Sequence, residues 1–233
     1  MDRLISIDQQ ITAILNGWNA AVLDPVMVFA SKVYVWMPLY IAIIIWYFAK
    51  QPWRRAMLTV AMLILAFAFT DRFSYFLKES ICRLRPCEDP AMAGPIRLLE
   101  KHGSLHGFPS GHATNTFCFA LLTSLTARRK WWTPIIFSWA AIVSYSRIYV
   151  GKHYFGDVLC GALLGLLCGY IFYLIIRRLN KLNVISGSRS KCVSGNHSRP
   201  RHARGRGPLA GRESEDACVG AKFPKTRCET GLK

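Results

Sequence analysis

The feature that most constrains this chain is the gathering of its apolar residues into long runs. A helix that crosses a bilayer needs about 20 mostly apolar residues. Four segments come close to that length or exceed it, namely 25–48, 57–77, 132–149 and 155–176. Runs of this kind predict an all-α fold, a polytopic membrane helix bundle.

Two further segments decide how many helices the bundle has. The apolar segment 110–127 is short, and it can cross the bilayer if its helix begins at Ser110 inside a membrane-embedded site. In segment 1–24 apolar residues alternate with polar ones at largely helical spacing, which predicts either an interfacial helix or a helix packed on the bundle. We therefore expect five to six transmembrane helices. The first twenty residues have no features of a cleavable signal peptide, so the internal segments are expected to direct insertion.

The strong positive charge of the chain is concentrated outside the apolar runs. The net charge is +17 over 233 residues, and much of the excess lies in segment 186–233 and in short clusters beside the spans. This placement favours membrane partners and argues against nucleic acid. We divide the chain into a membrane domain, 1–185, and a basic tail, 186–233. The tail is predicted to be disordered and cytoplasmic, with its Arg residues near anionic lipids, and its Cys and His residues lack the paired spacing of a zinc site.

Basic clusters also predict the orientation of the bundle in an inner or plasma membrane. Lys and Arg favour the cytoplasmic side, and such clusters follow the first, third and fifth predicted spans, at 50–55, 128–130 and 177–181. The loops after the second and fourth spans then face the periplasm or the cell exterior. Cys82 and Cys87 share the first of these loops, and both a disulfide and two free thiols are open for this pair.

Three polar motifs lie at the outer ends of these spans. They are Lys78 with Arg85 and Pro86, the run from Pro109 to His112, and Ser146-Arg147 followed by His153 and Asp157. Helices that return to one face of the membrane can bring all three together.

His153 and Asp157 are four residues apart, which places them on one face of a helix that starts near His153. A carboxylate that bonds one imidazole nitrogen fixes the tautomer and leaves the other nitrogen free to attack. Taken alone, the pair is better explained by a salt bridge at a helix end.

Ser110, Gly111 and His112 precede an apolar helical run, where free backbone N–H groups and the helix dipole favour an anion. Glycine allows close approach of the backbone, and His112 can give a proton to a leaving oxygen. Taken alone, these residues are a Ser N-cap beside a turn glycine.

Lys78, Arg85 and Arg147 supply fixed positive charge, and guanidinium groups bind phosphate oxygens in bidentate fashion. Each could by itself be a residue that snorkels to the interface. A phosphoryl-transfer site, however, needs cations, a nucleophile and an acid together.

Read together as KxxxxxxRP (78–86), PSGH (109–112) and SRxxxxxHxxxD (146–157), the motifs resemble the signature of the type 2 phosphatidic acid phosphatase superfamily. The resemblance implies that His153 attacks phosphorus to form a phosphohistidine, that Asp157 orients it and that His112 protonates the leaving group. It implies a phosphate cradle without metal or other cofactor, formed by Lys78, Arg85, Ser110, Gly111 and Arg147.

The predicted function is therefore an integral membrane phosphatase acting on a lipid-linked phosphate. Undecaprenyl diphosphate is the expected substrate, because the small bacterial members that the chain resembles recycle this carrier outside the cytoplasm. Arg83 and Lys152 add cations beyond those that one phosphoryl group needs, which also favours a diphosphate. Phosphatidic acid, phosphatidylglycerol phosphate and lipid A 1-phosphate are alternatives. From another class, a catalytically silent membrane scaffold stays open, although every motif position is present. A haloperoxidase is disfavoured because such relatives are soluble, and the oligomeric state is not predicted.

Overall fold

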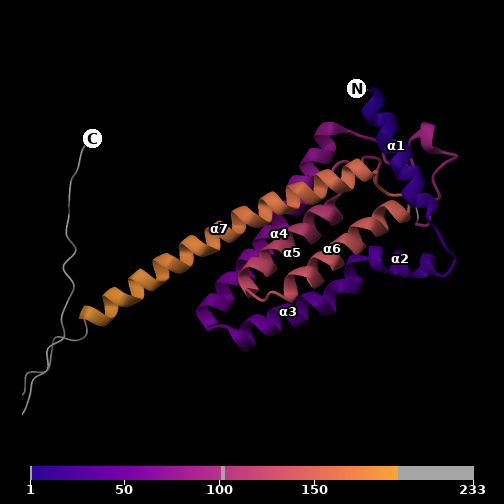
Figure 1. The fold of residues 1–233 in the computed structure, drawn as a ribbon. Helices are drawn as coiled ribbons and strands as arrows, with labels where there is room; N and C mark the ends of the chain where they lie inside the picture. Colours follow the sequence, from indigo (N-terminus) through magenta and orange to yellow (C-terminus); the bar gives the residue numbers. More distant parts are fainter. Residues whose placement is uncertain (1, 101–102, 194–233) are drawn as a thin grey trace, which may run out of the picture. The chain divides into compact units, whose positions relative to one another are not determined.

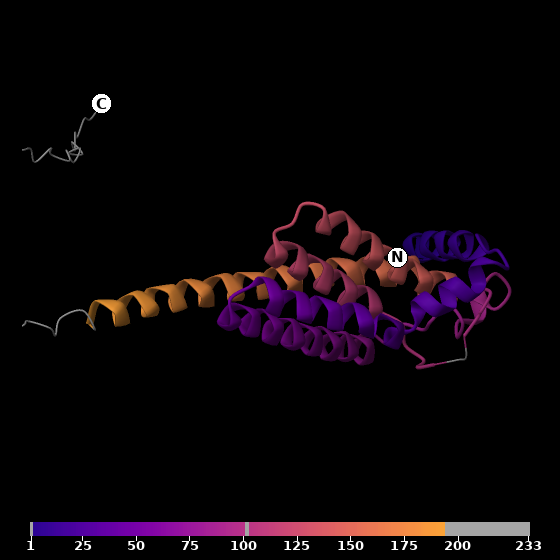
Figure 2. The ribbon, with the colours of Figure 1, turned by 90° about the horizontal axis from the view of Figure 1, so that it is seen from below.

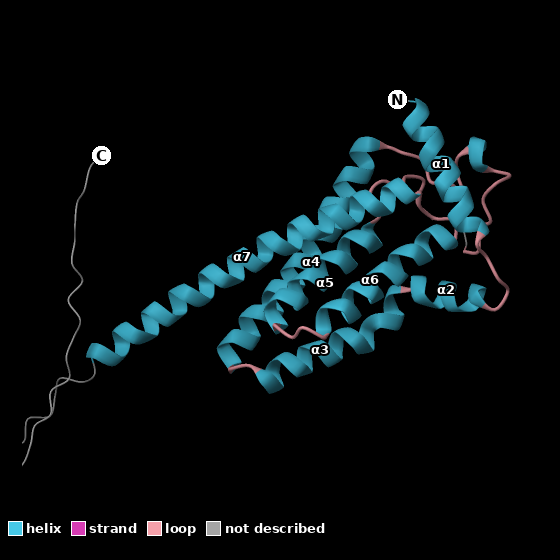
Figure 3. Ribbon diagram, viewed as in Figure 1, coloured by secondary structure: helices cyan, strands magenta, loops and turns pink. Residues whose placement is uncertain are grey.

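The computed structural model describes residues 2–100 and 103–193 (Figure 1). Within them the all-α prediction is confirmed: the chain forms helices joined by loops (Figure 3), and its β structure is one isolated bridge between Leu84 and His106. The elements are α1 (Asp2–Gly17), α2 (Leu23–Ser31), the 3-10 helix η1 (Val33–Trp36), α3 (Met37–Lys50), α4 (Trp53–Ile81), the 3-10 helix η2 (Pro90–Met92), α5 (Gly111–Ala127), α6 (Trp132–Tyr149) and α7 (Phe155–Val193).

Three helical segments of the described chain are long and apolar enough to cross a membrane: Val33–Lys50, Trp53–Ile81 and Phe155–Leu182. The other two predicted spans form α5 and α6, which run alongside α4 and α7 in both views of the bundle (Figures 1 and 2). The chain is thus a membrane helix bundle. Helix α7 continues to Val193 and thus includes the first residues of the predicted tail, 186–193. The rest of that tail, 194–233, lies outside the described residues.

The first predicted span is interrupted. In place of a continuous helix over 25–48, α2 ends at Ser31, Lys32 has an extended backbone conformation, and η1 and α3 follow. The indole nitrogen of Trp36 donates to the carbonyl of Ala30, 2.9 Å away across the break. The break brings the end of α2 to the same end of the bundle as the polar motifs.

Helix α1 packs on the bundle with its polar face inward. Thr12 and Asn16 are 0% and 1% exposed, whereas Leu4 and Ile14 are 71% and 57% exposed. In a soluble protein this distribution would be inverted. The helix therefore packs on the bundle, which was one of the two alternatives left open by the sequence, and a place for its outward apolar face at a membrane interface stays a prediction.

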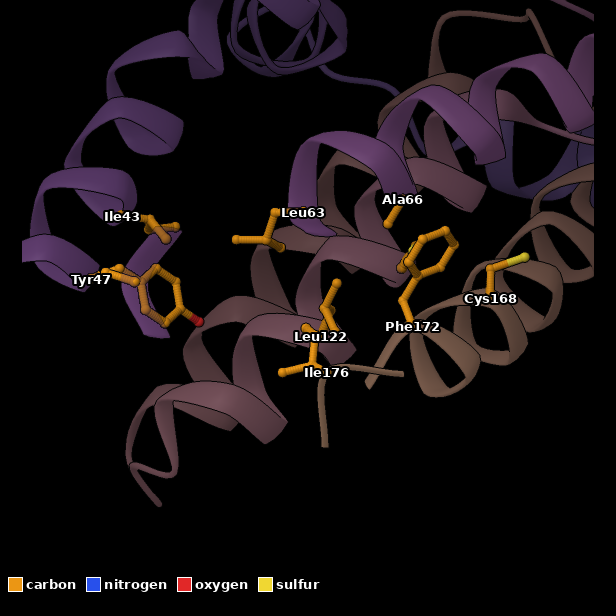
Figure 4. Close-up of a cluster of buried hydrophobic side chains, with 10 residues drawn as sticks. Ile43, Tyr47, Leu63, Ala66, Leu122, Cys168, Phe172 and Ile176 are labelled. Carbon is orange, nitrogen blue, oxygen red and sulfur yellow. The ribbon is translucent and has the colours of Figure 1, made fainter. Parts of the chain in front are cut away.

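The core lies between α3, α4, α5 and α7 (Figure 4). Figure 4 labels its principal side chains, which are Ile43, Tyr47, Leu63, Ala66, Leu122, Cys168, Phe172 and Ile176. Because lipid tails are as apolar as these side chains, association of such helices depends on close packing.

Close packing is most evident where α7 crosses α5. Gly161, Gly165 and Gly169 follow one another at intervals of four and form one face of α7. A Cβ atom on Gly161 would lie 2.6 Å from the carbonyl oxygen of Ser110, and one on Gly169 would lie 2.9 Å from that of Cys118. The backbones of the two helices are therefore in direct contact, as in other small-residue membrane interfaces.

We predict that Gly165→Ala lowers the midpoint of thermal unfolding of the detergent-purified protein. A Cβ atom there would lie 3.0 Å from the backbone nitrogen of Cys118 and closer still to the carbonyl of Thr114, and overpacking of this kind costs about 1–3 kcal/mol. Gly94→Ala is the matched control, since a Cβ atom on Gly94 meets nothing within 4 Å. Equal midpoints for the two variants would contradict the close α5 to α7 contact.

Candidate active site

The predicted site residues all lie at one end of the bundle, where four helices begin or end. This end holds the C-terminal turns of α4 and α6, the first turns of α5 and α7, and the loops that follow α4 and α6. Lys78 is in the last turn of α4, Arg85 in the loop after it, Ser110 at the N-cap of α5, Gly111 and His112 in its first turn, Arg147 in the last turn of α6, His153 in the next loop and Asp157 in the first turn of α7.

The three predicted cations surround His153. Arg147, Arg85 and Lys78 each act electrostatically on its imidazole, which is 2% exposed. Burial first, and then these positive charges, hold the pKa of His153 well below its ordinary value. The ring is therefore neutral near pH 7, the state in which a histidine nitrogen can act as a nucleophile.

His153 and Asp157 are neighbours, at a distance longer than predicted. Nδ1 of His153 lies 3.6 Å from Oδ2 of Asp157, within ion-pair range but beyond a hydrogen bond, and Nδ1 has no hydrogen-bond partner. Asp157 itself is fully buried. The side of the ring that faces the carboxylate is thus Nδ1, and Nε2 lies on the opposite side of the ring.

The second motif is tied directly to this carboxylate-bearing turn. The backbone nitrogen of Ser110 donates to the carbonyl of Asp157 at 3.0 Å, so the start of α5 is joined to the start of α7. Nε2 of His112 lies 3.1 Å from the carbonyl of Ser31, at the end of α2. The interruption of the first predicted span therefore supplies a fixed contact for His112.

Several donors at this end point to an anionic ligand. Six buried polar side-chain atoms of the described residues have no hydrogen-bond partner, and three of them belong to the site: Nδ1 of His153, which faces Asp157, and two donors, Oγ of Ser110 and Nε of Arg147. Lys78 approaches the same place, since its Nζ lies 3.6 Å from where a Cβ atom of Gly111 would be. Buried donors without partners are rare, and a phosphoryl group offers several acceptor oxygens to such a cluster.

Two of the cations also have protein partners. Arg85 donates through Nη2 to Oγ of Ser104 at 2.7 Å and through Nε to the carbonyl of His106 at 3.1 Å. Nη1 of Arg147 lies 3.4 Å from Oε2 of Glu100. The other carboxylate oxygen of Glu100, Oε1, accepts a hydrogen bond from the hydroxyl of Ser31. Loop residues between α4 and α5 thus orient both guanidinium groups, and no spacing in the sequence pointed to Glu100 or Ser31.

Arg83 contacts carboxylates, whereas the sequence predicted a cation available for phosphate. It was counted among the surplus cations, but Nη1 donates to Oδ1 of Asp157 at 2.8 Å and Nη2 donates to Oδ2 of Asp8 at 2.6 Å. Two carboxylates therefore occupy its guanidinium group. Lys152, the other extra cation, is 4% exposed and acts electrostatically on the same neighbourhood as Arg85, Glu100 and Arg147.

Other chemistry suggested by the sequence can be placed as well. Cys82 and Cys87 are free thiols. Over the described part of the chain, no group of three or more His, Cys, Asp or Glu residues is arranged to hold a metal ion.

Comparison with known proteins gives the family. The model of the PAP2 superfamily matches residues 55–181. A protein of Bacteroides thetaiotaomicron named lipid A 4'-phosphatase is 34% identical over 180 residues, 76% of this chain and 80% of that protein. An undecaprenyl-diphosphatase of Sulfolobus acidocaldarius is 31% identical over 164 residues, 69% of this chain and 74% of its own.

A solved structure supports the same assignment. The PAP2-type phosphatidylglycerolphosphate phosphatase of Bacillus subtilis superposes with a TM-score of 0.60 at 25% identity, covering 78% of this chain and 88% of that one. The residues matched by the family model, 55–181, include all three motifs. The chain therefore belongs to the PAP2 superfamily, and it is a membrane-embedded lipid phosphatase.

Proposed function

We propose that this enzyme hydrolyses the phosphate monoester of a glycolipid of the lipid A type through a phosphohistidine intermediate. The observation that carries the proposal is the convergence of a buried neutral imidazole, three cations and two unpartnered donors, the hydroxyl of Ser110 and Nε of Arg147, at one end of the bundle. Together these supply the nucleophile and the charge stabilisation that phosphoryl transfer requires.

In the first step, Nε2 of His153 attacks phosphorus as the bond to the lipid oxygen breaks. Charge on the equatorial phosphoryl oxygens is stabilised by Lys78, Arg85 and Arg147, and by the N-terminal end of α5 with Ser110 and Gly111. His112 gives its proton to the departing lipid oxygen, which leaves as an alcohol. Asp157 stabilises the positive charge that develops on the His153 ring.

In the second step, water replaces the lipid. The neutral His112 takes a proton from water, the resulting nucleophile attacks phosphorus, and the bond between phosphorus and Nε2 breaks. Inorganic phosphate leaves, His153 returns to its neutral form and His112 is again protonated. The cycle consumes one water molecule, and its first nucleophile and its acid–base group are side chains of this protein.

The two histidines can be distinguished by labelling. We predict no turnover for His153→Ala, because the phosphoenzyme cannot form. For His112→Ala we predict kcat lower by about 10²–10⁴-fold, the usual contribution of an acid–base group. With a phosphoryl-labelled substrate that has a good leaving group, His112→Ala should accumulate labelled protein, since hydrolysis of the intermediate then lacks its base.

The readout is acid-quenched gel autoradiography beside phosphate release, with membrane insertion checked by detergent extraction. Label retained by His153→Ala would reverse the two roles. Wild-type turnover by His153→Ala would end the proposed mechanism.

The substrate proposal revises the expectation drawn from charge. A diphosphate was favoured by surplus cations, but Arg83 is held by Asp8 and Asp157, and a carboxylate of Glu100 lies beside Arg147. Both findings reduce the positive charge available for a second phosphate. Similarity to a relative named lipid A 4'-phosphatase supports a monoester.

Undecaprenyl diphosphate is the second candidate, supported by the relative named for that activity. For either substrate we propose that the site faces the periplasm or the cell exterior. The support is that Lys50, Arg55 and Arg128 lie at the ends of helices away from the site, and basic residues favour the cytoplasmic side.

We predict that purified enzyme in detergent releases phosphate from lipid A with a higher kcat/KM than from undecaprenyl diphosphate or phosphatidic acid. Glu100→Gln should narrow the difference between lipid A and the diphosphate, because it removes a negative charge that opposes the second phosphate. A higher kcat/KM for undecaprenyl diphosphate in the wild-type enzyme would overturn the substrate proposal and leave the phosphatase assignment intact.

A further inference from the structure

Helix α1 presents a stripe of three polar side chains to the loop that carries His153. Asp8, Thr12 and Asn16 follow one another at intervals of four, one helical turn apart. Asn16 donates to the carbonyls of Ile148 and Tyr149 at 3.1 and 2.8 Å, and Thr12 accepts from the backbone nitrogen of Phe155 at 3.0 Å. The stripe thus satisfies backbone groups that are left free where α6 ends and α7 begins.

Asp8 does more than cap α7. Its Oδ1 accepts from the backbone nitrogen of Gly156 at 2.7 Å, while Oδ2 accepts from Nη2 of Arg83 at 2.6 Å. A Cβ atom on residue 156 would lie 2.8 Å from Oδ2 of Asp8, so the glycine is what allows the carboxylate to approach. Asp8 is therefore fixed on one side by α7 and on the other by Arg83.

Arg83 connects Asp8 to Asp157 in the site. Its other terminal nitrogen donates to Oδ1 of Asp157 at 2.8 Å, and its guanidinium carbon lies 4.3 Å from the ring centroid of Tyr154. The second oxygen of Asp157 accepts from the backbone nitrogen of Tyr154 at 3.1 Å and is the one nearest His153. Each oxygen of the Asp157 carboxylate thus has its own partner, and rotation of the carboxylate is blocked.

We propose that Asp8 and Arg83 are positioning residues, which act through Asp157 to hold the His153 imidazole for attack, so that α1 is part of the catalytic apparatus. The fork of a guanidinium group can bond two carboxylates at once with fixed geometry, which a Lys cannot do. Neither residue is within the set that binds the phosphoryl group. The proposal rests on the proposed role of His153 as the nucleophile.

The test is a double-mutant cycle on kcat. We expect Asp8→Asn and Arg83→Gln each to lower kcat about tenfold or more while KM changes little, because neither side chain touches the substrate. In the Asp157→Asn background, Asp8→Asn should lower kcat much less than it does in the wild type, since residues that act as one unit are not additive. Asp8→Glu should recover part of the lost kcat.

Two further variants separate positioning from simple docking of α1. Thr12→Val removes a hydrogen bond to α7 and leaves Arg83 untouched, so its kcat should fall far less than that of Asp8→Asn at a similar loss of thermal stability. Asp24→Asn breaks another carboxylate-to-arginine pair, with Arg97, and should keep wild-type kcat.

Equal loss of kcat in Thr12→Val and Asp8→Asn, or full additivity of Asp8→Asn with Asp157→Asn, would overturn the positioning role. If His153→Ala retained turnover, the proposed function would fail instead, and phosphoenzyme labelling would show this independently of the cycle.

A second inference concerns the opposite end of the bundle. A cavity of about 660 Å³ lies where α3 ends and α4 begins, and it extends to the end of α5 and to the distal part of α7. Five basic residues line it: Lys50 of α3, Arg55 of α4, Arg128 directly after α5, and Arg177 and Lys181 of α7. Among the described residues, no carboxylate lines this cavity, and Leu125, Tyr173 and Ile176 form an apolar part of its wall.

We infer that this basic cavity binds the phosphate of an anionic phospholipid from the adjoining leaflet. A preference for basic residues on one side of a membrane places cations at helix ends, but it does not require five of them to line one cavity. Basic cavities between helices at a membrane surface bind anionic headgroups, and the apolar wall can accompany the start of an acyl chain.

The test uses the full chain in a neutral detergent and follows its thermal-unfolding midpoint. Added dioleoyl phosphatidylglycerol should raise the midpoint of the wild type more than that of the double variant Arg55→Gln, Arg128→Gln, whereas dioleoyl phosphatidylcholine should act equally on both. An equal effect of phosphatidylglycerol on both proteins would overturn the site. A wild-type-specific effect of millimolar inorganic phosphate equal to that of the lipid would overturn the lipid as occupant.

Discussion

The buried carboxylate of Asp157 is the group on which the rest of this site depends. A fully buried charge is tolerated only with close partners, and Asp157 has Arg83 on one oxygen and the Tyr154 backbone and His153 on the other. Its own backbone carbonyl receives the nitrogen of Ser110. One residue thereby joins the loop after α4, the start of α5 and the start of α7.

The glycine face of α7 keeps this junction in register. Because the backbones of α5 and α7 touch along Gly161, Gly165 and Gly169, the first turn of each helix has little freedom to shift. His112 belongs to one of these turns and Asp157 to the other. The proposed acid and the carboxylate beside the proposed nucleophile are therefore held relative to each other by backbone contacts within the bundle.

The distribution of charge gives the site its chemical character. Lys78, Arg85 and Arg147 act electrostatically on the His153 ring, while Arg83 is engaged by two carboxylates and Glu100 faces Arg147. In the proposed mechanism, positive charge is thus divided between stabilising the transition state and holding the Asp157 carboxylate in place. A count of cations alone cannot separate these two uses, which is why the surplus-cation argument for a diphosphate was wrong in the case of Arg83.

The sequence by itself determined the helical membrane fold and the identity of the eight motif residues, because apolar run length and local polar spacing are properties of neighbouring residues. The break at Lys32, the α1 stripe and the roles of Arg83, Asp8 and Glu100 were decided only by tertiary structure. Asp8 and Arg83 are 75 residues apart, and a pairing over that distance leaves no local pattern. The four-residue spacing of Asp8, Thr12 and Asn16 is a property of the sequence. That these side chains bond the free backbone groups where α6 ends and α7 begins is decided by the tertiary structure.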